Sequence, residues 1–291
     1  MSLIQDLRRL RRINKQIVCA KPINKGLSNA RKYRLLTLQG PLFARCEYGY
    51  QYYIRNCVLE QIKHLPFALL PTKFTFDDET RTTYSIYPFI KGKSLDSTLW
   101  EFTSQRQERL GVLLGDHIKT IHDIAIELND YPGLNFLHVY HTTKRLLAFN
   151  PKPSSALFEI NQHIERNIHL TLKRPKSLTH QDLWLSNIML DKQDNLYLID
   201  WENADYADPW SDLAKMTVLS PEYCGAFVRG LLYGYFQGAI PAGFWDYQRL
   251  YAAIVMLVEA CRSSGFNNEV TINMSERLLK SLHTEKLGFD L

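Results

Sequence analysis

The chain has 291 residues, of which 45% are hydrophobic and 22% charged, values typical of a globular protein that buries a substantial core. Its formal charge is only +5, from 35 Lys and Arg against 30 Asp and Glu, which argues against nucleic-acid binding. The five cysteines form no CxxC pair, and the longest apolar stretch, 252–258, is too short to span a bilayer. We therefore expect a cytoplasmic protein with no signal peptide, no zinc cluster and no membrane partner.

The first part of the chain has a mainly β pattern. It begins with a basic run that could grip nucleic acid or a membrane surface, but apolar residues at helical spacing favour a packed amphipathic helix (Leu3, Ile4, Leu7 and Leu10). An apolar face predicts a second helix at 52–65. Alternating segments between turn residues predict strands at 16–20, 32–38, 42–47, 73–77 and 82–87.

The rest of the chain is mostly helical by periodicity. Apolar stripes predict helices at 106–124, 154–169, 222–236 and 244–261, and one strand-like island lies at 190–201. The change of pattern predicts an α+β chain with two lobes. Residues 1–92 would form a small β-rich lobe, and residues 93–291 a larger helical lobe.

The segment from Leu178 to Ala214 carries the chemistry. It places Asp182 and Asn187 five positions apart, and an apolar strand then leads to Asp200. Phosphoryl transfer from ATP needs a carboxylate that orients the attacking hydroxyl and accepts its proton, and hard oxygen ligands for Mg²⁺. We predict the first role for Asp182 and the second for Asn187 and Asp200.

This segment resembles the catalytic region of the aminoglycoside phosphotransferase and choline kinase superfamily, whose members have a protein-kinase-like fold and phosphorylate small molecules. The resemblance implies that His180, Asp182 and Asn187 form the catalytic loop, and that Asp200 binds metal. It also implies that Asp212, in Asp-Leu-Ala, ties down that loop. His180 would orient the loop backbone, with a role in proton transfer as the alternative.

The resemblance extends to the residues that would bind ATP. The turn 26–29, with Ser28 and Asn29, is similar to the one that covers the phosphates; an ordinary hairpin turn is the alternative. Arg45 matches the cation that holds the α- and β-phosphates, and Phe89 and Ile90 lie in a hinge-like segment whose backbone would bind adenine. The family places a Glu in the helix after this cation. Here the nearest acid is Glu60, which either pairs with Arg45 or leaves that role to another acid or to water.

The acceptor is expected to be a small molecule with a hydroxyl group. Protein substrates are not expected, because the segment between Asp200 and Asp212 is too short for an activation loop. Acidic residues beside aromatic ones favour a cationic acceptor of the choline, ethanolamine, thiamine or aminoglycoside type, with Glu202 and Trp184 as candidate contacts. For Asp208 and Trp210, helix capping and core packing are the favoured interpretation. The alternative for the whole chain is a catalytically inactive kinase fold that binds nucleotide or a partner.

Overall fold

The computed structural model describes residues 3–24, 30–49, 59–125, 133–148, 155–220, 222–262 and 269–284. They belong to two compact units. One comprises Met1–Lys93 with Met189–Glu202, and the other Ser94–Ile188 with Asn203–Leu291. The sequence suggests a single division after residue 92, whereas the contacts group segment 189–202, which ends in Asp200 and Glu202, with the N-terminal residues.

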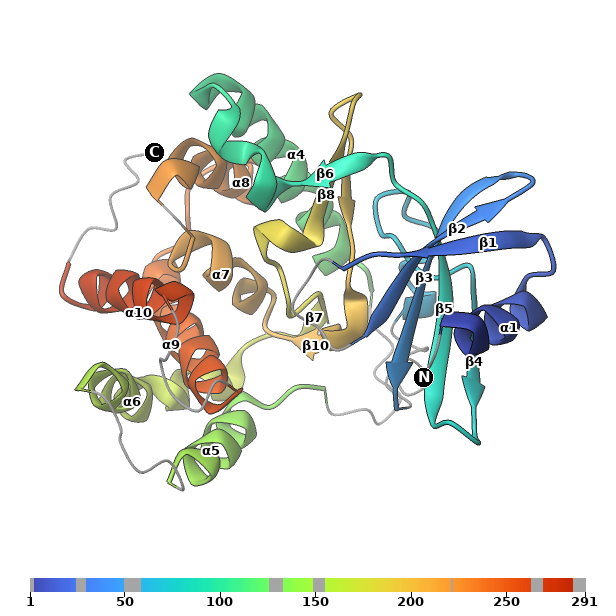
Figure 1. Cartoon of the computed structure of the whole chain (residues 1–291). Helices are drawn as coiled ribbons and strands as arrows, with labels where there is room; N and C mark the ends of the chain where they lie inside the picture. The colour runs from blue at the N-terminus through green and yellow to red at the C-terminus, as the bar shows by residue number, and fades with distance from the viewer. Residues whose placement is uncertain are drawn as a thin grey trace. The chain divides into compact units, whose positions relative to one another are not determined.

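An antiparallel five-stranded sheet dominates the first unit, in the order β1-β2-β3-β5-β4 (Figure 1). Its strands are β1 (Ile17–Pro22), β2 (Arg31–Thr37), β3 (Gly40–Tyr48), β4 (Lys73–Asp77) and β5 (Thr82–Pro88). All five predicted strands are therefore present; β4 has the predicted ends, and the other four are shifted by one or two residues. β3 is central and pairs Arg45 with Lys32 on β2 and with Ser85 on β5. Of the helix predicted at 52–65, residues 52–58 lie outside the described residues, and the chain turns after Glu60.

Helix α1 (Leu3–Ile13) confirms the predicted amphipathic helix and contacts β1 and β4. Leu10 is buried, whereas Leu3 and Ile4 are exposed. The helix also buries Asp6, which accepts hydrogen bonds from Arg31 Nε at 2.6 Å and from the Tyr33 hydroxyl at 2.6 Å. Burial alone would raise the pKa of Asp6, but the bonds from Arg31 and Tyr33 outweigh it and lower the pKa.

The substitution Asp6→Asn is expected to lower the free energy of unfolding by about 2 kcal/mol at neutral pH, because it removes the buried charge that accepts hydrogen bonds from the part-buried Arg31 and from Tyr33. The folded-state pKa lies below the ordinary value of 3.8, so Asp6 stabilises the fold above that value. The difference in unfolding free energy between the wild type and the variant should therefore shrink as the pH falls through the folded-state pKa of Asp6. Urea unfolding between about pH 7 and pH 3 measures this difference.

A matched control is Asp123→Asn, which affects a Lys119–Asp123 pair whose Asp side chain is 60% exposed. It should cost less than about 0.5 kcal/mol at every pH. If Asp6→Asn kept its full deficit at acid pH, the charge of Asp6 would not be the source of its contribution.

A short hairpin carries the chain to Asp200. It consists of β8 (Ile188–Asp191) and β9 (Leu196–Leu198), and β6 (Gly92–Ser94) lies beside β8. Gly92 is required there, since a Cβ atom would lie 2.2 Å from the carbonyl oxygen of Leu190. Two residues past β9, Asp200 adopts a left-handed backbone conformation with φ of 67°. The predicted strand-like island is thus a hairpin that presents this carboxylate.

Helices build the second unit: α4 (Ser104–His122), α5 (Phe136–Leu147), α6 (Ser155–Asn167), α7 (Ala214–Thr217), α8 (Gly225–Phe236), α9 (Phe244–Arg262) and α10 (Glu269–Leu282). The backbones of α4 and α8 touch, because glycines face the contact. A Cβ atom at Gly111 would lie 2.1 Å from the Phe227 carbonyl oxygen. Helix α9 contacts α5, α6 and α10 and buries Leu250 and Leu257 (Figure 1). The four predicted helices are confirmed, whereas α5 and α10 had not been predicted.

Short elements complete the second unit. Strands β7 (Ser177–Thr179) and β10 (Asp205–Ala207) pair antiparallel. Among the helices that the structure describes, none has the length and apolar character needed to cross a membrane. The 3-10 helices within the described residues are η1 (Leu95–Ser97), η2 (Leu99–Glu101), η3 (Ile168–Lys173), η4 (Leu185–Asn187), η5 (Trp201–Asn203), η6 (Pro209–Leu213) and η7 (Glu222–Cys224).

Candidate active site

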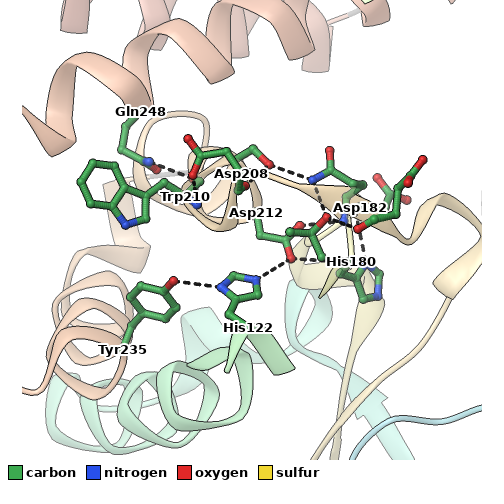
Figure 2. A network of polar contacts seen from close by, with 12 residues as sticks. His122, His180, Asp182, Asp208, Trp210, Asp212, Tyr235 and Gln248 are labelled. Atoms are coloured by element: carbon green, nitrogen blue, oxygen red, sulfur yellow. Dashed lines mark hydrogen bonds and ion pairs between the residues drawn. The ribbon is translucent and has the colours of Figure 1, made fainter. Parts of the chain in front are cut away.

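The loop that follows β7 is held by the carboxylate of Asp212. Its two oxygens accept hydrogen bonds from the backbone N–H groups of His180 at 2.7 Å and Gln181 at 2.6 Å (Figure 2). Gln181 adopts a left-handed conformation with φ of 59°, which is unfavourable for a residue with a side chain. Asp212 therefore fixes the loop in a conformation that the local sequence does not favour by itself.

Asp212 is in turn held by His122 at the end of α4, which Tyr235 of α8 supports. His122 Nε2 lies 3.2 Å from the Asp212 carboxylate, and His122 Nδ1 lies 2.9 Å from the hydroxyl of Tyr235. Burial alone would raise the pKa of Asp212, but hydrogen bonds and nearby imidazoles lower it overall. A buried carboxylate with this many donors stays ionised, so it can anchor two backbone N–H groups at once.

His180 is fully buried and turns back onto its own loop. Its Nδ1 accepts a hydrogen bond from the backbone N–H of Asp182 at 3.2 Å. Because a backbone N–H can only donate, this Nδ1 carries no proton. The contact is the one expected of a residue that orients the loop backbone.

The carboxylate of Asp182 is fixed at both oxygens. One oxygen accepts a hydrogen bond from Asn187 Nδ2 at 3.0 Å, and the other lies 2.5 Å from the ammonium group of Lys215. Asn187 Nδ2 also donates to the backbone carbonyl of Asp182 at 2.8 Å. Both of these bonds use the nitrogen of Asn187, which leaves its amide oxygen to accept a bond or to ligate a cation. The structure thus brings together three predicted residues of the loop and adds Lys215, which the sequence analysis had missed.

In the first unit, three carboxylates surround the buried guanidinium of Arg45. Arg45 Nη1 lies 2.9 Å from Asp200 and 2.5 Å from Glu202, and Nη2 lies 2.7 Å from Glu202 and 3.1 Å from Glu47. Glu60 pairs instead with Lys63. Of the alternatives that the sequence leaves open, other acids therefore take the place of Glu60 beside Arg45.

Burial and two neighbouring carboxylates make the charged form of Glu202 unfavourable. Burial raises its pKa to about 8, against the attraction of Arg45 and with the repulsion of Asp200 and Glu47. Strongly shifted pKa values of this kind are common at functional sites. Glu202 follows Asp200 by two positions, but nothing in the sequence connects it with Arg45.

In the second unit, two tryptophans contact cations of the chain itself. The Lys215 ammonium lies 4.9 Å from the ring centroid of Trp184, and the Arg174 guanidinium lies 4.0 Å from that of Trp210. Asp208 caps η6 by accepting a bond from the backbone N–H of Trp210, and it pairs with Arg174 at 2.5 Å. The capping interpretation of Asp208 and the packing interpretation of Trp210 are confirmed.

The remaining predicted contacts concern nucleotide and metal. Ser28 and Asn29 lie outside the described residues. Phe89 and Ile90 follow β5 and are half-buried, with the Arg34 guanidinium 4.8 Å from the centroid of the Phe89 ring. Across the described ranges, no group of three or more His, Cys, Asp or Glu residues could hold a metal ion. For Mg²⁺, the oxygens of Asn187 and Asp200 are chemically suitable donors.

Comparison with known proteins identifies the family. The model of the phosphotransferase enzyme family matches residues 57–252. An uncharacterized protein of Metamycoplasma hominis is 25% identical over 197 residues, which cover 66% of this chain but only 35% of that protein. The chain thus matches about a third of the length of this curated relative.

Two solved structures share the fold. The choline kinase LicA from Streptococcus pneumoniae superposes with a TM-score of 0.69 at 17% identity, covering 97% of this chain and 99% of LicA. A spectinomycin phosphotransferase in complex with ADP and spectinomycin superposes with a TM-score of 0.62 at 15% identity. The match covers 98% of this chain and 95% of that chain. At these identities the likeness shows the protein-kinase-like fold. The family model matches more than half of the chain, which therefore belongs to the phosphotransferase enzyme family.

Proposed function

We propose that this protein is a small-molecule kinase, which transfers the γ-phosphoryl group of ATP to a hydroxyl of a small molecule in a Mg²⁺-dependent reaction. The observation that carries the proposal is the catalytic loop, in which Asp212 fixes the backbone while Asn187 and Lys215 fix the Asp182 carboxylate. A carboxylate held this rigidly is suited to orient a hydroxyl nucleophile. The solved spectinomycin phosphotransferase contains ADP, which supports nucleotide binding by the same fold.

Each residue has a distinct task in the proposed reaction. Asp182 orients the acceptor hydroxyl and accepts its proton as the new O–P bond forms and the bond to ADP breaks. Arg45 binds the α- and β-phosphates, the backbone at Phe89 and Ile90 binds adenine, and the turn with Ser28 and Asn29 covers the phosphates. Asn187 and Asp200 would hold Mg²⁺, which supplies positive charge to the phosphates when bound.

For the acceptor, we propose a hydroxyl compound, with cationic compounds of the choline, ethanolamine, thiamine and aminoglycoside type as the first class. The two residues predicted to contact a cationic acceptor already contact cations of the chain itself. Glu202 is already paired with Arg45, and Lys215 lies over Trp184. A cationic acceptor that used Glu202 or Trp184 would have to compete with these internal cations.

The substitution Glu202→Gln distinguishes two roles for this residue. Because both oxygens of Glu202 contact Arg45, the variant is expected to raise the KM for ATP more than the KM for the acceptor. Steady-state kinetics with each substrate varied in turn measures the two effects. A larger rise in the KM of a cationic acceptor would instead favour the direct contact with the acceptor that the sequence suggests.

The reaction itself is tested by ADP formation from Mg·ATP across a panel of acceptors that includes choline, ethanolamine, thiamine, aminoglycosides, sugars and fructosamines. Asp182→Asn serves as the blank. Acceptor-dependent ADP formation above this blank would support the proposal and identify the acceptor class. Binding of Mg·ATP without turnover of any acceptor would favour a catalytically inactive nucleotide-binding module. Failure of the wild type to bind Mg·ATP would contradict both the kinase and the nucleotide-binding module.

A further inference from the structure

Lys215 contacts the loop at three points. Its ammonium group lies 2.5 Å from the carboxylate of Asp182, 3.2 Å from the carbonyl oxygen of Gln181 and 4.9 Å from the ring centroid of Trp184. The side chain is only 9% exposed. Lysine is usually a solvated residue, so its burial against a carboxylate is a specific arrangement.

The ammonium group and Asn187 restrain Asp182 from two sides. Lys215 contacts Oδ1, and Asn187 Nδ2 donates to Oδ2. A carboxylate oxygen has two lone pairs, so each oxygen can accept one such bond and still face a hydroxyl. The two contacts together fix the rotation of the carboxylate about its χ2 bond, which is otherwise broad.

The segment formed by η6 and α7 holds both the backbone of the catalytic loop and the side chain of Asp182. Asp212, in η6, binds the N–H groups of His180 and Gln181, and Lys215 follows one helical turn later in α7. α7 packs against α9, which is buried in the core of the second unit. The ammonium group of Lys215 therefore projects from a helix that is packed against the core, and a contact that positions a catalytic group accurately requires such support.

From this geometry we propose that Lys215 is a positioning residue of the transfer reaction, which holds the Asp182 carboxylate in the orientation that receives the acceptor hydroxyl. The inference rests on the proposed function and deepens it. Misplacement of a catalytic group by about 1 Å can cost about 100-fold in rate. Loss of Lys215 should therefore act on turnover, with little effect on the binding of ATP.

The substitution Lys215→Met tests this role, because it keeps the length of the side chain and removes the ammonium group. We expect kcat to fall by about 10-fold to 100-fold, with the KM for ATP changed less than about threefold. Lys215→Arg restores a positive charge with a different shape and is expected to recover part of the lost kcat. A matched control is Lys119→Met, which removes the lysine of an exposed Lys–Asp pair on α4 and should leave kcat unchanged.

The outcomes separate the positioning role from a purely structural one. Melting temperatures of the Lys215 variants report stability, and a kcat loss that exceeds the loss of folded protein, with partial recovery by Lys215→Arg, supports positioning. A kcat for Lys215→Met within about threefold of the wild type, or Lys215→Arg no more active than Lys215→Met, would overturn it. If the wild type forms no ADP above the Asp182→Asn blank, the proposed function fails first, and the inference fails with it.

Discussion

Replacement of Asp182 by Asn is expected to lower kcat by about 100-fold to 10,000-fold, the range typical of a lost general base. The variant keeps the shape of the side chain, so Asn187 retains its bond to the Asp182 backbone carbonyl. It loses the negative charge beside Lys215 and the capacity to accept the proton of the hydroxyl. The binding of ATP should survive, because the predicted phosphate contact, Arg45, pairs with residues of the first unit.

Single-turnover and steady-state kinetics with a productive acceptor, together with calorimetry of ATP binding, measure the two effects separately. A suitable control is Asp123→Asn, on an exposed pair. Turnover retained by Asp182→Asn would show that another group accepts the proton.

Asp200→Ala is expected to abolish the Mg²⁺ dependence of ATP binding, the second large effect. Asp200 presents its carboxylate from a left-handed conformation at the end of the hairpin, where it also contacts Arg45 at 2.9 Å. Removal of the carboxylate takes away a hard oxygen ligand, while Glu47 and Glu202 still hold Arg45. Residual binding of ATP without metal is therefore expected.

Titration of ATP with and without Mg²⁺ measures this prediction. The hairpin offers a matched control in Asp194→Ala, since Asp194 also has a positive φ, of 61°, and shares any backbone cost of the substitution. Unchanged affinity of Asp200→Ala for Mg·ATP would place the metal on other residues.

The sequence predicted most of the elements because their patterns are local. The five strands of the first sheet lie in alternating or β-branched segments between turn residues, and α4 and α9 carry long apolar stripes. α10 escaped prediction because its buried positions include Thr271, Ser275 and Ser281, so burial there does not follow an apolar stripe. α5 likewise buries Tyr140 and Thr143 rather than aliphatic residues.

The site could be predicted only where its residues share one motif. Asp182, Asn187, Asp200 and Asp212 stand in one short segment whose spacing resembles a family motif. The partners of Arg45 could not be predicted in this way, since Glu202 is distant in sequence and no periodicity connects the two. Lys215 adjoins Asp212-Leu213-Ala214, but a lone lysine after a motif carries no signal until the fold places it on Asp182.

The central claim is that a phosphoryl group passes from ATP to an acceptor hydroxyl under the control of Asp182. The most direct measurement is mass spectrometry of the acceptor after incubation with Mg·ATP and either the wild type or Asp182→Asn. The account predicts a phosphorylated acceptor with the wild type and almost none with the variant. Hydrolysis of ATP to ADP and orthophosphate without any phosphorylated acceptor, or an equal yield of phosphorylated acceptor from both proteins, would contradict it.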